Sequence, residues 1–244
     1  MPSACTLDTS GMLSRLLDLA VAIAMDTALL EEVEAKETWR PTDQDDDAPG
    51  QRPQLSRHSA LDMVRSVVQQ MSYEDLAPTC RLESLHQEGS AWPSSAPHGG
   101  VRFFDVLVHF DVSVSLITLE PGACIPLHDH SGLWGFSKLL VGELQITKFD
   151  IAQPLPPRAF RIGAHVDVCN RCIMTLPVGD VDELTPTAGN IHSITNHGAA
   201  TAVWLYVLLP PYQDDASCHY FVASEFEDRL LVVEEARAWG PLKH

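Results

Sequence analysis

The chain has 244 residues, and its 33 acidic residues outnumber its 16 basic residues, which gives a formal net charge of −17 at pH 7. A surface this negative repels phosphate backbones, so the composition argues against a nucleic-acid partner and favours cationic ligands. Hydrophobic residues make up 45% and charged residues 20%, as in an ordinary globular protein with one sizeable domain.

The first predicted element is a helix over residues 10–37, where apolar residues recur at three- and four-residue spacing. Its most apolar part, residues 16–30, contains Asp18 and Asp26 and is too short and too charged to span a bilayer. It also lacks the basic flank and cleavage site of a secretory signal. We therefore expect an amphipathic helix packed on the main body, no membrane contact, and a location in the cytoplasm or the nucleus.

Residues 40–54 are rich in Pro, Asp and Gln without periodicity, which predicts a flexible loop. A second helix is predicted over residues 59–71, with a capping-box pattern at Ser59. We accordingly divide the chain into two parts. Residues 1–56 hold the N-terminal helix and the acidic, Pro-rich loop, and residues 57–244 hold the second helix and the main domain.

From residue 101 onward the chain consists of short runs rich in β-branched and aromatic residues, separated by Pro and Gly turn signals. Because no helix-length periodic segment interrupts these runs, they predict an all-β barrel or sandwich of about 110–120 residues. The final segment, residues 222–238, is predicted as a strand followed by a helix.

The six cysteines form no disulfide framework, and we expect free thiols in a reducing compartment. Cys169 and Cys172 form the one C-x-x-C. A tetrahedral zinc site would need a second ligand pair, so we assign both cysteines to a strand or turn.

The main candidate site is a group of histidines. His128 and His130 lie on a predicted strand, where alternate residues face the same side, so both imidazoles point into one space while Asp129 points away. His192 begins another strand after a Pro/Gly turn. Three neutral imidazoles suit Fe, Zn, Cu and Ni alike. Divalent iron could bring a thiolate and dioxygen together on its open face, whereas zinc with a bound water would favour hydrolysis or hydration.

Glycines bracket the first histidine pair as G-x5-H-x-H-x11-G, from Gly122 to Gly142. Together with His192, this layout resembles the two sequence motifs of the cupin superfamily, in which inward-facing histidines from two strands share one metal in a small β-barrel. The resemblance implies a mainly β fold, a cupin double-stranded β-helix barrel with N-terminal α-helices. A glutamate usually stands between the histidine pair and the closing glycine, and here its position is Gly135.

Residues 126–150, 184–195 and 205–212 further resemble the thiol dioxygenases that comprise cysteamine dioxygenase and the plant cysteine oxidases. The likeness extends over roughly residues 60–225. It implies Fe(II) held by three histidines and insertion of both atoms of O₂ into a thiol to give a sulfinic acid. The substrates implied are cysteamine or the N-terminal cysteine of a polypeptide, whose oxidation could feed an N-degron oxygen-sensing pathway. We expect a monomer. The implied metal ligands are His128, His130 and His192.

The resemblance also implies roles for three further residues. Tyr212 matches a family tyrosine that could hydrogen-bond bound oxygen or substrate. Cys218 and Tyr220 resemble the stretch in which the animal enzyme can form a Cys–Tyr crosslink. One departure bears on activity, because the family usually has an aspartate where Tyr206 stands, and that acid is a candidate for binding the substrate amine or shuttling a proton.

Two alternatives remain open from the sequence. The first is a catalytically weak or silent metal-binding cupin that binds a thiol or a partner protein, which the change at Tyr206 supports. The second is a Zn or Mn cupin isomerase or hydrolase, because three histidines do not identify the metal.

Overall fold

The computed structural model describes residues 9–37, 57–76, 99–130, 132–152, 160–212, 218–224 and 228–239. The helices in these ranges are α1 (Thr9–Glu37), α2 (Arg57–Gln70), α3 (Tyr73–Leu76) and α4 (Glu235–Trp239). The strands are β1 (Val101–Val108), β2 (Ser113–Leu119), β3 (Cys124–Asp129), β4 (Trp134–Val141), β5 (Leu144–Ile151), β6 (His165–Leu176), β7 (Val181–Leu184), β8 (Ile191–Thr195), β9 (Ala202–Leu209), β10 (Tyr220–Ala223) and β11 (Arg229–Val233). None of the described helices has the length and apolar character that crossing a membrane requires.

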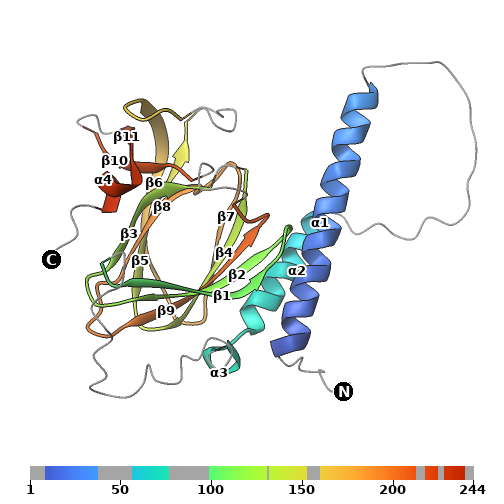
Figure 1. Ribbon diagram of the computed structural model, residues 1–244, viewed down its shortest axis with the longest axis horizontal. Helices are drawn as coiled ribbons and strands as arrows, with labels where there is room; N and C mark the ends of the chain where they lie inside the picture. Colours follow the sequence, from blue (N-terminus) through green and yellow to red (C-terminus); the bar gives the residue numbers. More distant parts are fainter. Residues whose placement is uncertain are drawn as a thin grey trace, which may run out of the picture.

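Two antiparallel sheets enclose the interior of the domain. The first has five strands in the order β1-β2-β9-β4-β7, and the second closes as β10-β11-β6-β5-β8-β3. Figure 1 shows α1 and α2 on the outer side of the five-stranded sheet and the second sheet on the opposite side of the interior. The predicted mainly β barrel with N-terminal helices is confirmed.

The position of strand β9 explains why its sequence, AVWLYVLL, lacks charged residues. Every residue of this strand is buried, because one face packs against the helices and the other faces the barrel interior. Val203, Leu205 and Val207 belong to the cluster that contains the helices. Trp204 and Tyr206 belong to the interior cluster. A strand covered on both faces loses the polar–apolar alternation of a strand with one wet face.

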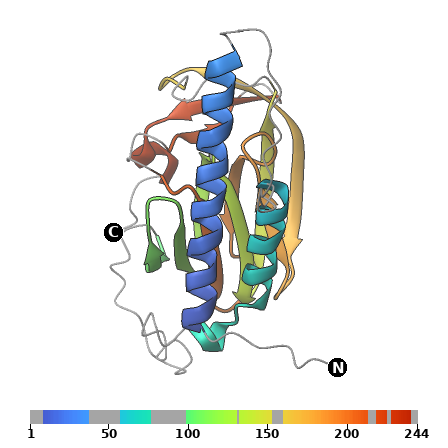
Figure 2. The same ribbon diagram turned by 90° about the vertical axis from the view of Figure 1, so that its right-hand side faces the viewer.

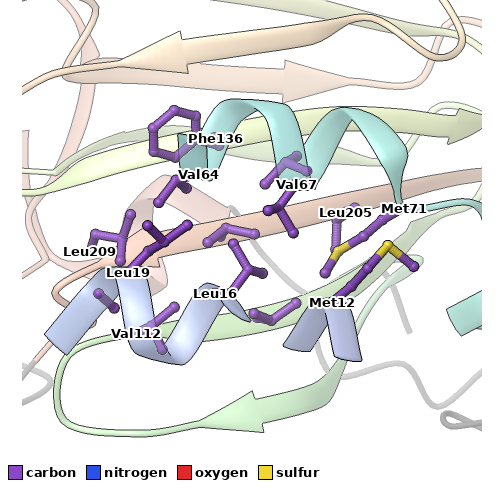
Figure 3. Packing of buried hydrophobic residues seen from close by; sticks show 14 of the residues in the cluster. Met12, Leu16, Leu19, Val64, Val67, Met71, Val112, Phe136, Leu205 and Leu209 are labelled. Atoms are coloured by element: carbon purple, nitrogen blue, oxygen red, sulfur yellow. The ribbon is translucent and has the colours of Figure 1, made fainter. Parts of the chain in front are cut away.

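The N-terminal helices lie side by side across the outer face of the sheet (Figure 2). Leu16 of α1 is fully buried and belongs to one cluster with Val64 of α2, Met71 directly after α2, and Leu205 of β9, as Figure 3 shows. This shared cluster attaches α1 to the barrel, so the amphipathic helix predicted for residues 10–37 packs on the main body as expected.

Replacing Leu16 by alanine is expected to lower the free energy of unfolding by about 3 kcal/mol, because deleting a fully buried leucine leaves a cavity between helix and sheet. Leu17→Ala is the matched control, since Leu17 is only partly buried, and its loss should be about 1 kcal/mol. Urea unfolding followed by circular dichroism measures both values. Equal losses in the two variants would contradict the packing of α1 through Leu16.

Four local predictions concern helix α2, the C-terminal segment, the C-x-x-C cysteines and the acidic loop. Helix α2 runs from Arg57 to Gln70, which confirms the helix predicted at about residues 59–71, but Ser59 lies in its first turn and not at its N-cap position. The C-terminal segment contains two strands, β10 and β11, before its helix, where the sequence predicted one. Cys169 and Cys172 lie on β6 as exposed free thiols, as predicted. The flexible loop predicted for residues 40–54 falls outside the described residues.

Candidate metal centre

The structure brings His128, His130 and His192 together inside the barrel. His128 lies on β3 directly opposite His192 on β8, and His130 follows the end of β3. The Nε2 atom of His130 is 3.0 Å from that of His128 and 2.9 Å from that of His192. All three side chains are buried. Three imidazole nitrogens therefore converge on one point in the interior.

Hydrogen bonds orient two of the rings with Nε2 toward this point. Nδ1 of His128 donates to the carbonyl oxygen of Pro126 over 2.8 Å. The Tyr212 hydroxyl donates to the carbonyl oxygen of Asp129. Its oxygen is thereby free to accept from Nδ1 of His130, 2.6 Å away. Because Nδ1 carries the proton in both rings, the lone pair of each Nε2 faces the centre, which is how histidines bind a metal.

Burial keeps the three imidazoles uncharged. It lowers the pKa of His128, and it lowers the pKa of His130 and of His192 well below the usual value of 6.5. The neighbouring histidines reinforce the shift at both of the latter, and the charge of Lys148 does so at His192. A neutral imidazole is the form that coordinates a metal.

The donor set fits one metal ion. Two nitrogens that each lie about 2.1 Å from one ion would be about 3.0 Å apart at a right angle and about 3.4 Å apart at a tetrahedral angle. The two separations at His130, 3.0 and 2.9 Å, match the right angle. Three imidazole nitrogens leave up to three positions of an octahedral ion for other ligands.

No carboxylate of the described chain completes this group, and two observations explain why. Asp129 points away, as predicted, and its Oδ1 accepts a hydrogen bond of 2.6 Å from the backbone N–H of His219. At Gly135, where the cupin pattern has a glutamate, an added Cβ would lie 2.7 Å from Cγ of Leu184. This packing excludes a longer side chain at Gly135, so the site depends on histidine alone.

A pocket of about 730 Å³ opens beside the histidines. His128 and His130 form part of its wall, together with Tyr206, Tyr212 and Cys218. It is large enough to hold a ligand of several residues or a drug-sized molecule. A ligand in this pocket could reach the space onto which the imidazole nitrogens converge.

Tyr206 occupies a place that the sequence did not predict. Its hydroxyl oxygen lies 3.0 Å from Nε2 of His130, and its ring stacks on Trp204 with 4.6 Å between centroids. Burial raises the pKa of Tyr206 well above its usual value of 10.0, so the side chain stays a neutral phenol that can donate a hydrogen bond. This chain thus places an uncharged hydrogen-bond donor next to the histidines.

Cys218 and Tyr220 line the same pocket. The Tyr220 ring lies 6.2 Å from the His128 ring, and its hydroxyl donates to Glu235 over 3.3 Å. Burial, followed by the negative charge of Asp129, raises the pKa of Cys218 to about 12. Cys218 is therefore a protonated thiol at neutral pH.

Cys218 is expected to react with iodoacetamide at pH 8 at least about 100-fold more slowly than the exposed Cys169 and Cys172, because the thiolate is the nucleophile. Alkylation for timed intervals, followed by peptide mapping with mass spectrometry, measures the rates. Folding raises the pKa of Cys218 from 9.0 to about 12. The contribution of the protonated thiol to the free energy of unfolding is therefore complete below pH 9 and is lost as the pH rises toward 12. Equal alkylation rates at the three cysteines would contradict this burial.

Comparisons with known proteins place this chain among characterised relatives. Residues 67–239 match the PCO_ADO family model. The chain is 27% identical over 190 residues to 2-aminoethanethiol dioxygenase of Mus musculus, which covers 66% of this chain and 67% of the relative. It is 28% identical over 207 residues to plant cysteine oxidase 2 of Arabidopsis thaliana, which covers 79% of this chain and 70% of the relative. For 2-aminoethanethiol dioxygenase of Homo sapiens, the 27% identical match covers 64% of the relative.

The chain thus spans about two thirds of the length of these relatives. Among solved structures, a double-stranded β-helix protein of Klebsiella pneumoniae aligns with a TM-score of 0.36 and 20% identity, covering 52% of this chain and 87% of that chain.

Proposed function

This chain belongs to the PCO_ADO family, and on that basis we propose that it is a non-haem Fe(II) thiol dioxygenase. Its substrate is the thiol of cysteamine or of an N-terminal cysteine, and its product is the sulfinic acid. The observation that carries the proposal is the group of three buried, neutral histidines, without a carboxylate, beside an open pocket. The names of the relatives, 2-aminoethanethiol dioxygenase and plant cysteine oxidase, supply the substrate class.

His128, His130 and His192 would hold the ion through Nε2. Bound there, Fe(II) supplies an open face at which a thiolate and O₂ can react. Both oxygen atoms end on sulfur, which is oxidised by four electrons as O₂ is reduced, and the thiol proton is released. Because the protein contributes no negative charge to the ion, a thiolate is better accommodated than a neutral ligand.

Side chains around the histidines orient ligand and substrate. Tyr212 fixes the ring of His130 through its oxygen, and it also lines the pocket, where its hydroxyl can meet substrate. Tyr206 presents a neutral hydroxyl beside His130, which can donate to developing negative charge on oxygen. Cys218 and Tyr220 border the same space.

Oxidation to a sulfinic acid is hard to reverse. A protein whose N-terminal cysteine is oxidised therefore carries a lasting mark, and the dependence on O₂ would let the enzyme report oxygen supply to an N-degron pathway in the cytoplasm or nucleus. The protein would act as a monomer on its thiol substrate and O₂.

The test uses the full chain loaded anaerobically with Fe(II) and then exposed to air with cysteamine or, separately, a short peptide that begins with cysteine. Mass spectrometry should find a gain of two oxygen atoms, and zinc-loaded protein of the same chain should give none. Gain on cysteamine alone would restrict the function to small thiols. Absence of gain on both, with iron shown to be bound, would overturn the dioxygenase proposal and favour a thiol-binding cupin.

A further inference from the structure

A row of polar side chains crosses the inner face of the five-stranded sheet. Residues directly opposite each other on neighbouring strands point to the same face. Tyr206 points toward the histidines, so the residues in register with it face the interior as well. The row runs from β1 at one edge of the sheet to β7 at the other and consists of Asp105, Ser115, Tyr206, Ser137 and Asp182. We call the exposed Asp105 end the outer end and the less exposed Asp182 end the inner end.

The outer part of this row forms the middle of one pocket wall. On one side lies a row of Phe103, Ile117 and Trp204, and on the other side a row of Val108, Ser113 and Leu208. The β-bulge between Asp105 and Leu107 brings Val108 into this register. The wall thus has a polar centre between two largely apolar rows, and the nine residues that line the pocket from this side are Phe103, Asp105, Val108, Ser113, Ser115, Ile117, Trp204, Tyr206 and Leu208.

The two ends of the polar row differ in how their charge is compensated. At the inner end, Asp182 is paired with Lys148. At the outer end, Asp105 is exposed and accepts one long hydrogen bond, 3.4 Å, from Oγ of Ser115. Within the described residues Asp105 has no ion-pair partner, and the pocket wall contains the carboxylates of Asp105 and Glu235 without a lysine or arginine. No lysine or arginine of the described residues therefore lies at the outer end of the pocket.

The distance from the histidines indicates what kind of ligand could supply a cation at the outer end. Neighbouring strands lie about 4.8 Å apart, so Asp105 is about 10 Å from Tyr206 along the sheet. The amine of cysteamine is only about 4 Å from its sulfur, and a thiol at the histidines would leave it far from Asp105. A lysine or arginine side chain shortly after an N-terminal cysteine spans this distance, and the pocket of about 730 Å³ accommodates such a segment.

We propose that Asp105 is a specificity-determining residue that pairs with a cationic side chain following the N-terminal cysteine of a polypeptide substrate. The inference rests on the proposed thiol dioxygenase function and selects the polypeptide over free cysteamine as the ligand that fills the pocket. Phe103 and Val108 flank the carboxylate and are 52% and 68% exposed. They offer apolar surface to the aliphatic stem of a lysine or arginine.

The test compares peptides that differ in one residue, Cys-Lys-Gly-Ala against Cys-Glu-Gly-Ala and Cys-Gly-Lys-Ala against Cys-Gly-Glu-Ala. Binding to iron-loaded protein is measured by titration calorimetry under argon, and kcat/KM for sulfinic acid formation is then measured in air. In at least one pair, the wild type should bind the lysine peptide about threefold to tenfold more tightly, as expected for a partly exposed ion pair. Asp105→Lys should reverse that preference.

Asp111→Asn is the matched control, because Asp111 pairs with His109 in the β1–β2 turn and does not line the pocket. It should keep the wild-type preference. A preference that survives Asp105→Lys, or an absence of preference in both peptide pairs, would overturn the role of Asp105. Charge-selective binding under argon without oxidation in air would support Asp105 and overturn the dioxygenase proposal, so the two failures are distinguishable.

Discussion

Replacing His192 by leucine is expected to abolish metal binding while leaving the metal-free protein at least as stable as the wild type. Removal of an outer partner of a metal ligand typically lowers affinity 10- to 100-fold. Loss of one of only three ligands should therefore lower iron affinity and thiol oxidation by more than about 100-fold.

Without metal, the free energy of unfolding of His192→Leu should be equal to or higher than that of the wild type. His192 is fully buried, and its Nδ1 has no hydrogen-bond partner among the described residues. A buried polar atom without a partner costs about 1–3 kcal/mol, whereas leucine has a similar volume and needs no partner. Such a cost is expected at a site selected for binding rather than for stability.

Thermal unfolding with and without Fe(II) under argon measures both effects. In the wild type, free ion at 100 times Kd should add about 2.7 kcal/mol of stability, and in His192→Leu this gain should vanish. His197→Leu is the control, because His197 is exposed and lies outside the histidine group, and it should keep the full gain. A metal-induced shift that persists in His192→Leu would exclude His192 as a ligand.

Alternation along one strand was enough to predict which of three neighbouring side chains face the site, whereas the addition of His192 rested on the resemblance to the cupin motifs. Because side chains on a strand alternate with a period of two, His128 and His130 had to share a face and Asp129 had to oppose them. Hydrophobic periodicity was likewise enough to predict both N-terminal helices. These features depend on residues close together in the chain.

Features that depend on strand order could not be predicted in the same way. The place of the Tyr206 hydroxyl beside His130 requires β9 to lie between β2 and β4, and no local pattern specifies that order. The row from Asp105 to Asp182 requires the register of four strand pairs. The clash that excludes a side chain at Gly135 depends on Leu184, which is distant in sequence.

Lys148→Met is expected to lower the free energy of unfolding by about 2–3 kcal/mol, because it leaves the largely buried carboxylate of Asp182 without its charge partner. Lys148 donates to Asp182 and, over 2.9 Å, to the carbonyl oxygen of Glu183. The side chains of the pair are only 12% and 11% exposed. Lys148 lies directly opposite His192 on the β5–β8 pair, so this ion pair supports the strand that carries a proposed ligand.

A second replacement separates loss of the charge pair from loss of packing. Lys148→Met combined with Asp182→Leu should recover most of the stability, since an apolar pair of similar volume avoids the cost of a buried unpaired charge. Arg229→Met is the exposed control, because Arg229 and Asp167 form a pair whose side chains are 48% and 60% exposed, and it should cost less than about 1 kcal/mol. Chemical denaturation of the four proteins measures these differences. If the double variant were as unstable as Lys148→Met alone, the aliphatic packing of Lys148 rather than its charge would stabilise the inner end of the polar row.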